Sequence, residues 1–252
     1  MPALNEEKNI LPAIQRTLKA FGDLNIKGEI IVVNDGSTDH TEALIQEMMA
    51  QDPRIHKLKH ERPQGIGASF WDGVQDAQGN IVTMFPGDNE NDPYEALRYL
   101  DLLQHVDIVV PFVYNRGSRG KFREFLSFLY RIIINLSFQM NLNYTNGTVL
   151  YRKPILANMQ LQSKGFLYQT EILVKMIRKG YLFAEVPCSL GKRTTGVSKA
   201  LSFRSFINVV KSYIRLLLAI YGPGSENRQD GPVQDSATFI RWKGMMNGKN
   251  HS

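Results

Sequence analysis

The stretch Glu29-Ile-Ile-Val-Val-Asn-Asp-Gly-Ser-Thr-Asp39 decides the fold class. Its first half is a short run of β-branched residues, which is typical of a strand buried on both faces of a parallel sheet. Its second half, Asn34–Asp39, consists of residues that favour turns, so the strand ends there. Apolar residues at helical spacing precede it over Ile10–Phe21, and we expect Asn5 to cap that helix. Another helix is predicted to follow over Thr41–Ala50.

The same alternation continues downstream and predicts an α/β fold with a largely parallel sheet flanked by helices. Two longer apolar stretches, Phe125–Leu142 and Phe203–Tyr221, are interrupted by basic residues and predict amphipathic helices. We expect a main domain over residues 1–200, an amphipathic helix over 201–221 and a disordered tail over 222–252, where Gly, Pro, Ser, Asn and Gln predominate. Further strands are predicted at Ile55–Lys59, Ile81–Phe85, Asp107–Pro111 and Leu182–Val186, with helices after Gly65, through Leu97 and over Glu171–Lys179.

Composition narrows the classes of partner. The 252 residues carry a formal net charge of +6, which suits ligands with phosphate groups, such as nucleotides, nucleic acid or an anionic membrane surface. The single cysteine, Cys188, excludes an internal disulfide framework and fits a reducing, cytoplasmic location. No uncharged apolar run reaches the roughly 18 residues of a spanning helix, and we expect no signal peptide. The five histidines lack metal-ligand spacing, so we assign them no chemistry.

Acidic residues follow two of the predicted strands. Asp35 and Asp39 come after one strand, and Asp88, Glu90 and Asp92 come after another. Ligands of parallel α/β sheets bind at the carboxyl ends of the strands, where both acidic loops should lie. Carboxylates are the ligands that hard cations prefer, so the two loops predict a cation held beside a nucleotide. The alternative is that these residues only form turns and helix caps.

Six motifs follow one another along the chain: Pro2-Ala-Leu-Asn-Glu-Glu7, Asn34–Asp39, Gly65-Ile-Gly-Ala68, the acidic loop at Asp88, Tyr168-Gln-Thr-Glu171 and Arg193-Thr-Thr-Gly-Val-Ser-Lys199. In this order they resemble the motifs of the family-2 glycosyltransferases, and most of all those of the dolichyl- and polyprenyl-phosphate sugar synthases. The resemblance covers roughly residues 1–220. It implies a GT-A fold, a nucleoside-diphosphate sugar as donor and inversion at the anomeric carbon.

The resemblance also implies where the donor and a metal bind. Asp88 matches the last Asp of the family's Asp-X-Asp motif, and the first Asp of that motif is replaced by Pro86. Glu90 could restore the lost charge, so we expect Asp88 and Glu90 to hold Mg²⁺ or Mn²⁺. The donor-binding residues that the resemblance implies are Pro2, Asn5, Glu6, Asp35 and Gly67.

The resemblance and the chemistry of the acceptor together suggest roles for four basic residues and for Glu171. Arg193 and Lys199 match a basic loop over the donor diphosphate, where cations would stabilise the leaving group. Arg116 and Arg119 lie where the family handles an acceptor phosphate. A lipid phosphate is already largely ionised at neutral pH and can attack without a general base. A hydroxyl acceptor of polysaccharide or glycolipid assembly would need a base, for which Glu171 is the first choice, although Glu171 could equally be a favourable acid at a helix N-terminus.

The predicted partners are a nucleotide sugar, a lipid phosphate and a membrane surface bound peripherally on its cytoplasmic side, through the amphipathic helices. We expect no nucleic acid as ligand, and a homo-oligomer or a membrane-anchored subunit remains open. The family usually carries an apolar strand before the Pro2 motif, whereas Met1 abuts Pro2 here, so the sequence leaves open whether the sheet has its first strand. Pro86, Asn143 and the abrupt start leave a second interpretation open, in which the chain is a nucleotide-sugar-binding scaffold with little activity.

Overall fold

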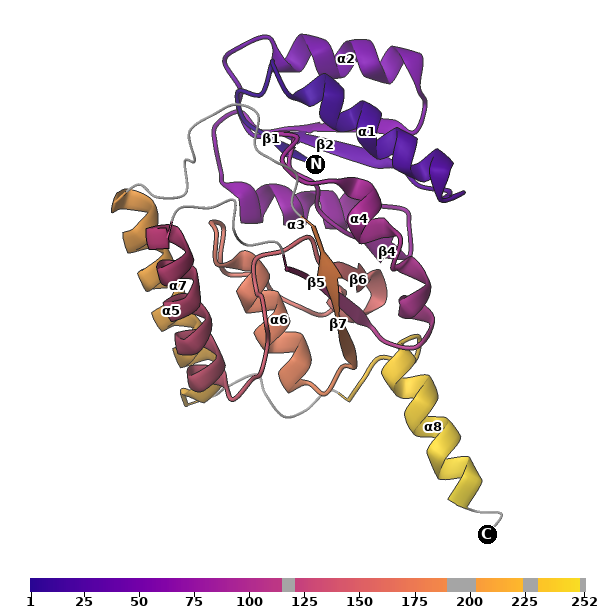
Figure 1. Cartoon of the computed structure of the whole chain (residues 1–252), viewed down its shortest axis with the longest axis vertical. Coiled ribbons are helices and arrows are strands. Elements are labelled where there is room, and N and C mark those ends of the chain that lie inside the picture. Colours follow the sequence, from indigo (N-terminus) through magenta and orange to yellow (C-terminus); the bar gives the residue numbers. More distant parts are fainter. Residues whose placement is uncertain (115–120, 190–202, 224–230, 250–252) are drawn as a thin grey trace.

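The computed structural model describes residues 1–114, 121–189, 203–223 and 231–249. They form two sheets with helices packed around them (Figure 1). In the first sheet, β2 (Ile30–Asn34) lies between β1 (Pro2–Ala3) and β3 (Ile55–Lys59) and runs parallel to both. All five residues of β2 are buried, as predicted for a strand that is covered on both faces.

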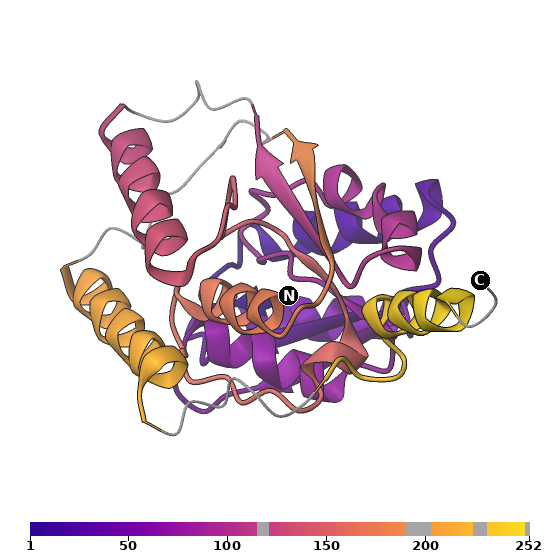
Figure 2. The same ribbon diagram turned by 90° about the horizontal axis from the view of Figure 1, so that it is seen from below.

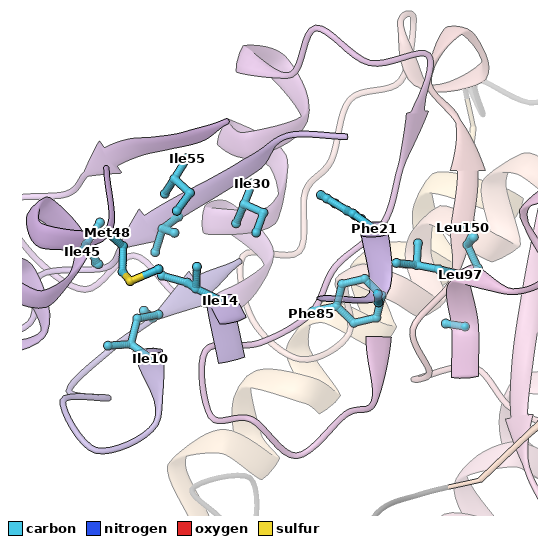
Figure 3. Close-up of a cluster of buried hydrophobic side chains, with 14 of the residues drawn as sticks. Ile10, Ile14, Phe21, Ile30, Ile45, Met48, Ile55, Phe85, Leu97 and Leu150 are labelled. Atoms are coloured by element: carbon cyan, nitrogen blue, oxygen red, sulfur yellow. The ribbon is translucent and has the colours of Figure 1, made fainter. Parts of the chain in front are cut away.

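Helices cover both faces of the first sheet. α1 (Ile10–Asp23) and α2 (Thr41–Gln51) lie on one side and α3 (Ile66–Asp76) lies on the other (Figure 1). Ile10 and Ile14 of α1 meet side chains of α2 and of the sheet in a buried cluster (Figure 3). The buried positions of α1 recur at helical spacing, which explains why its sequence pattern predicts this helix.

The second sheet has the order β4-β6-β5-β7 and mixes strand directions. β5 and β7 are parallel, whereas β6 runs antiparallel to both β4 and β5. β4 is shorter than the predicted strand at Ile81–Phe85, and β6 has no counterpart among the predicted strands. The bounds are β4 (Ile81–Val82), β5 (Ile108–Val113), β6 (Leu150–Arg152) and β7 (Phe183–Cys188). α6 (Tyr168–Arg178) packs against this sheet, whereas the short helix α4 (Pro93–Leu97) packs against α1. Two further short helices are η1 (Leu100–Gln104) and η3 (Lys153–Leu156).

Apolar side chains join the two sheets into one body. Phe21 of the first half lies in the same buried cluster as Phe85, Leu97 and Leu150 (Figure 3). The first strand, which the sequence left open, is β1 and has two residues. Beside β1, residues of both sheets line a cavity of about 1120 Å³. The ladder of strand hydrogen bonds does not continue from one sheet to the other.

The two predicted amphipathic helices are formed. α5 (Lys121–Phe138) and α7 (Phe203–Tyr221) lie side by side, outside α6 (Figures 1 and 2). They are joined by a hydrogen bond of 2.6 Å between the Ser137 and Tyr213 hydroxyls and by a shared apolar cluster. Among the described residues, no helix is long and apolar enough to cross a membrane.

The chain ends differently from the disorder predicted over 222–252, because α8 (Ala237–Lys249) is a helix. The fully buried carboxylate of Asp107 accepts hydrogen bonds from the backbone N–H of Ala237 at 2.7 Å and of Thr238 at 3.0 Å. These are the free donors at the start of a helix, and a carboxylate is a favourable partner for them. From this anchor α8 extends away from the body of the molecule (Figure 1).

Candidate functional site

The loops that follow β1 and β2 interlock at the carboxyl end of the first sheet. The side-chain oxygen of Asn5 accepts from the backbone N–H of Thr38 at 2.8 Å, and the backbone N–H of Asn5 donates to the Ser37 hydroxyl at 3.0 Å. The backbone N–H of Glu6 donates to the Thr41 hydroxyl at 2.8 Å. Because of these bonds, the two loops form one rigid edge of the site.

Asn5 does not cap α1, contrary to the prediction from its position. The residue before α1 is Asn9, and the amide of Asn9 donates to the Glu6 carboxylate at 2.9 Å. Asn5 has a positive φ of 55°, a left-handed conformation that asparagine tolerates better than most residues. This conformation turns the chain back toward the β2 loop, where the Asn5 amide is used instead.

Carboxylates in the interlocked loops are kept ionised by hydrogen bonds. Bonds from His40 hold the pKa of Glu7 below its ordinary value. Burial raises the pKa of Asp39, but hydrogen bonds from Thr41 and Glu7 outweigh it and the pKa is lowered. Asp39 accepts from the backbone N–H and the hydroxyl of Thr41, the first residue of α2, and so supports the turn that leads into this helix.

Asp35 is buried and holds the next loop. One carboxylate oxygen accepts from the backbone N–H of Gln64 at 2.7 Å and the other from Gly65 at 2.9 Å. The first oxygen also lies 2.7 Å from Nδ1 of His60, whose Nε2 lies 2.9 Å from Asp72. His60 was assigned no chemistry, because its partners lie far from it in sequence and no spacing rule reports them.

The acidic loop after β4 lies against the first sheet. The backbone N–H of Gly87 donates to the carbonyl of Pro2 at 2.9 Å. A Cβ at Gly87 would meet Ile10 at 3.0 Å and Ala3 at 3.3 Å, so only glycine fits without a shift of its neighbours. This close approach brings the loop that carries Asp88 to the donor-binding residues predicted at Pro2, Asn5 and Glu6.

Arg16 of α1 fixes the outer part of the acidic loop. Its guanidinium donates to the carbonyl and side chain of Asn89, at 3.3 and 3.0 Å, and lies 3.2 Å from the Asp92 carboxylate. Asp88 in turn accepts from the backbone N–H of Glu90 at 3.1 Å. Arg16 was missed from the sequence, since nothing in the pattern of α1 relates it to a loop 73 positions away.

The donor set of this loop fits a magnesium or manganese ion. Asp88 and Glu90 are close in sequence, only partly buried, and offer the hard oxygen ligands that these ions take. In the part of the chain that the structure describes, no group of three or more His, Cys, Asp or Glu side chains is placed to hold a metal. Mg²⁺ is commonly held by one or two carboxylates together with phosphates of a substrate and water, so two carboxylates suffice.

Gly67 lets α3 approach a second loop closely. Its backbone N–H donates to the carbonyl of Lys164 at 2.8 Å, and a Cβ there would come within 2.4 Å of the Ser163 carbonyl. The structure thus gives Gly67 a packing role between two loops, and its predicted contact with the donor stays a prediction.

Glu171 holds that second loop from inside the protein. Only 1% of Glu171 is exposed. Its two oxygens accept from the backbone N–H groups of Gln162 at 2.9 Å and Ser163 at 2.8 Å, and the Lys175 ammonium lies 2.9 Å away. Both oxygens are therefore engaged, and this geometry does not favour a base that meets an acceptor hydroxyl.

The four predicted basic site residues lie outside the described residues: Arg116, Arg119, Arg193 and Lys199. The segments that contain them adjoin Tyr114 and Ser189, which follow the parallel strands β5 and β7 at their carboxyl ends. The backbone N–H of Tyr114 donates to the Cys188 carbonyl at 3.3 Å. That of Ser189 donates at 3.0 Å to Glu95 of α4, the helix that begins directly after the acidic loop.

The first half of the chain is a parallel sheet with interlocked loops at its carboxyl edge, and an acidic loop connects it to a mixed sheet in the second half. This arrangement is the GT-A class of glycosyltransferase folds. Residues 1–160 match the model of glycosyl transferase family 2, so the chain belongs to this family.

Two curated relatives are similar over most of their length. Polyprenol monophosphomannose synthase of Mycolicibacterium smegmatis is 28% identical over 79% of this chain and 78% of its own. Undecaprenyl-phosphate mannosyltransferase of Micrococcus luteus is 25% identical over 79% of this chain and 85% of its own.

Solved structures show the same fold at lower identity. Mannosyl-3-phosphoglycerate synthase of Rubrobacter xylanophilus superposes with a TM-score of 0.68 at 16% identity, over 92% of this chain and 77% of its own. Glucosyl-3-phosphoglycerate synthase of Mycobacterium tuberculosis, solved with Mn²⁺ and uridine-diphosphate-glucose, gives 0.63 at 21% identity, over 89% and 78%.

Proposed function

We propose that the protein is an inverting hexosyltransferase that moves a sugar from a nucleoside-diphosphate sugar to a lipid phosphate. The observation that carries this proposal is the contact between Gly87 and Pro2, because it sets the Asp88 loop beside the interlocked loops at the carboxyl edge of the first sheet. That edge is where α/β sheets bind nucleotides. The names of both curated relatives, which refer to polyprenyl or undecaprenyl phosphate and mannose, support the acceptor class and the hexose.

In this proposal Asp88 and Glu90 hold Mg²⁺ or Mn²⁺ together with the donor diphosphate. A bound cation there would neutralise the charge that appears on the leaving nucleoside diphosphate. Pro2, Asn5, Glu6 and Asp35 shape the nucleoside end of the site, Asp35 by fixing the loop above it. Arg193 and Lys199 are proposed to contact the diphosphate, where a guanidinium and an ammonium would stabilise the same developing charge.

The surroundings of Glu171 favour a phosphate acceptor over a hydroxyl acceptor. A hydroxyl must lose a proton as it attacks and needs a base, whereas a phosphate monoester is already ionised. Glu171, the first choice for such a base, is buried with both oxygens occupied. A lipid phosphate needs only to be positioned, and we propose Arg116 and Arg119 for that task.

The α5–α7 face, defined as the exposed apolar side chains of these two helices, supports peripheral binding to a membrane. An apolar surface of this extent on neighbouring helices is typical of an interaction site. Lys211 and Arg215 are exposed on the same helix pair and would meet anionic headgroups. The face comprises Phe125, Phe128, Leu129, Ile133 and Leu136 of α5 and Phe206, Ile207, Val210, Ile214, Leu218 and Tyr221 of α7.

The test is release of nucleoside diphosphate from a panel of nucleotide sugars, with Mg²⁺ or Mn²⁺, in the presence and absence of a short polyprenyl phosphate. We expect release to require both metal and lipid phosphate. Asp88→Asn should lower the rate by at least about 100-fold, because it removes a charged ligand of the ion. Asp76→Asn, at the exposed end of α3, is the matched control and should leave the rate unchanged.

Two other outcomes have defined meanings. Release that depends on a sugar hydroxyl acceptor and ignores polyprenyl phosphate would favour the hydroxyl-acceptor enzyme. Binding of a nucleotide sugar without release, under every acceptor and metal tried, would favour the scaffold protein.

A further inference from the structure

A buried histidine lies between two carboxylates beside the donor loops. His60 follows β3 directly and is 8% exposed, and it links Asp35 after β2 to Asp72 on α3. The three residues come from three different elements of the first half of the chain. The cluster therefore connects the end of β2 to α3, the helix on the face of the first sheet that α1 and α2 do not cover.

Each ring nitrogen of His60 faces a carboxylate: Nδ1 lies beside an oxygen of Asp35, and Nε2 lies beside an oxygen of Asp72. The contact of His60 with Asp35 is 2.7 Å and that with Asp72 is 2.9 Å. Asp35 is almost fully buried, whereas 46% of the Asp72 side chain is exposed. A buried carboxylate needs such a partner far more than an exposed one does.

The loop between His60 and α3 packs directly on the turn after Asp35. Gly36 has a positive φ of 74°, and a Cβ there would come within 3.0 Å of the backbone of Arg62 and Pro63. The backbone N–H groups of Gln64 and Gly65 end on the Asp35 carboxylate. His60 thus closes a ring of contacts that fixes both the Asp35 side chain and residues 61–65.

We infer that His60 is a positioning residue for the nucleoside end of the donor site: it holds Asp35 and, through it, the loop over residues 61–65. This inference rests on the proposed function, because Asp35 belongs to the proposed donor site. If His60 only stabilised the fold, its loss would lower stability without a selective effect on the donor. As a positioning residue, it should control donor affinity more than the rate of the chemical step.

Two substitutions separate the two nitrogens of the ring. The amide of asparagine can replace Nδ1 and keep a donor to Asp35, whereas the longer glutamine replaces Nε2 and can keep a donor only to Asp72. We expect His60→Gln to raise the KM for the nucleotide sugar, and the Kd of the nucleoside diphosphate measured by calorimetry, by about tenfold, the effect of losing one hydrogen bond to a charged group. The kcat should change by less than about threefold, because Asp35 contacts no reacting atom in the proposal.

His60→Asn is the matched control and should keep the KM within about threefold of the wild type, as should Asp72→Asn, which removes only the exposed end of the cluster. Thermal unfolding of each variant shows how much of an effect is loss of fold. The inference is overturned if His60→Asn and His60→Gln raise the KM equally, or if both lower Tm while the donor constants stay unchanged. A wild-type protein that binds no nucleotide would instead remove the proposed function, and the role of His60 with it.

Discussion

At the scale of single residues, the acidic loop carries three carboxylates: Asp92 pairs with Arg16, and Asp88 and Glu90 are the proposed metal ligands. Asp88 and Glu90 are neighbours on the loop, and the contacts of Gly87 and Arg16 hold that loop in place. With only two protein ligands, binding of the metal ion depends strongly on how precisely the loop positions both carboxylates.

Arg16 should therefore affect metal affinity without touching the metal. Replacing Arg16 by Gln removes its ion pair with Asp92 and its bonds to Asn89, so the loop becomes less ordered. We expect the Mn²⁺ concentration for half-maximal activity to rise about threefold to tenfold, since the pair is partly exposed and worth little more than 1 kcal/mol. Lys19→Gln, which removes an exposed pair with Asp23 on the same helix, is the control. An equal rise in both variants would show that Arg16 has no special role.

Substitutions at Glu171 can distinguish a structural role of this carboxylate from a role as general base. Glu171→Gln leaves the buried Lys175 ammonium without its carboxylate, which should destabilise the protein by about 3 kcal/mol in chemical denaturation. The double variant Glu171→Gln with Lys175→Met removes the whole pair and should recover part of that loss. Transfer to polyprenyl phosphate should persist in the double variant at low temperature. Complete loss of transfer with unchanged stability would instead identify Glu171 as a catalytic residue.

At the level of the elements, the parts that local patterns predict are those formed by local contacts. β2, α1 and α2 follow from one apolar run and from helical spacing, and the structure confirms them. The start of α8 could not be predicted, because its cap is Asp107, about 130 positions earlier in the chain. His60 was missed for the same reason, since its partners are 25 and 12 positions away and on different elements.

At the scale of the whole molecule, the proposed donor site and the proposed membrane contact lie on different elements: the first at the carboxyl edge of the first sheet, the second on α5 and α7. α5 and α7 lie together on one side of the body and α8 extends from another (Figure 2). α6 lies between the helix pair and the second sheet, since it contributes to the apolar clusters on both sides. The α5–α7 face is thus attached to the sheet whose strands β5 and β7 lead into the segments with the proposed phosphate-binding arginines.

Membrane binding through this face can be tested apart from catalysis. Leu136 of α5 is 77% exposed and Leu218 of α7 is 64% exposed, so replacing both by Glu should leave the fold intact. The double variant should bind at least about tenfold more weakly to vesicles of phosphatidylglycerol and phosphatidylcholine, because it loses apolar insertion and adds repulsion from the anionic lipid. Its transfer to a short, water-soluble polyprenyl phosphate should match the wild type.

Ile240→Glu on α8, where the Ile240 side chain is 60% exposed, is the control for a negative charge added outside the α5–α7 face. Equal vesicle binding by the wild type and the double variant would rule out this face as the contact and leave α8 as the next surface to test, because it also exposes apolar side chains.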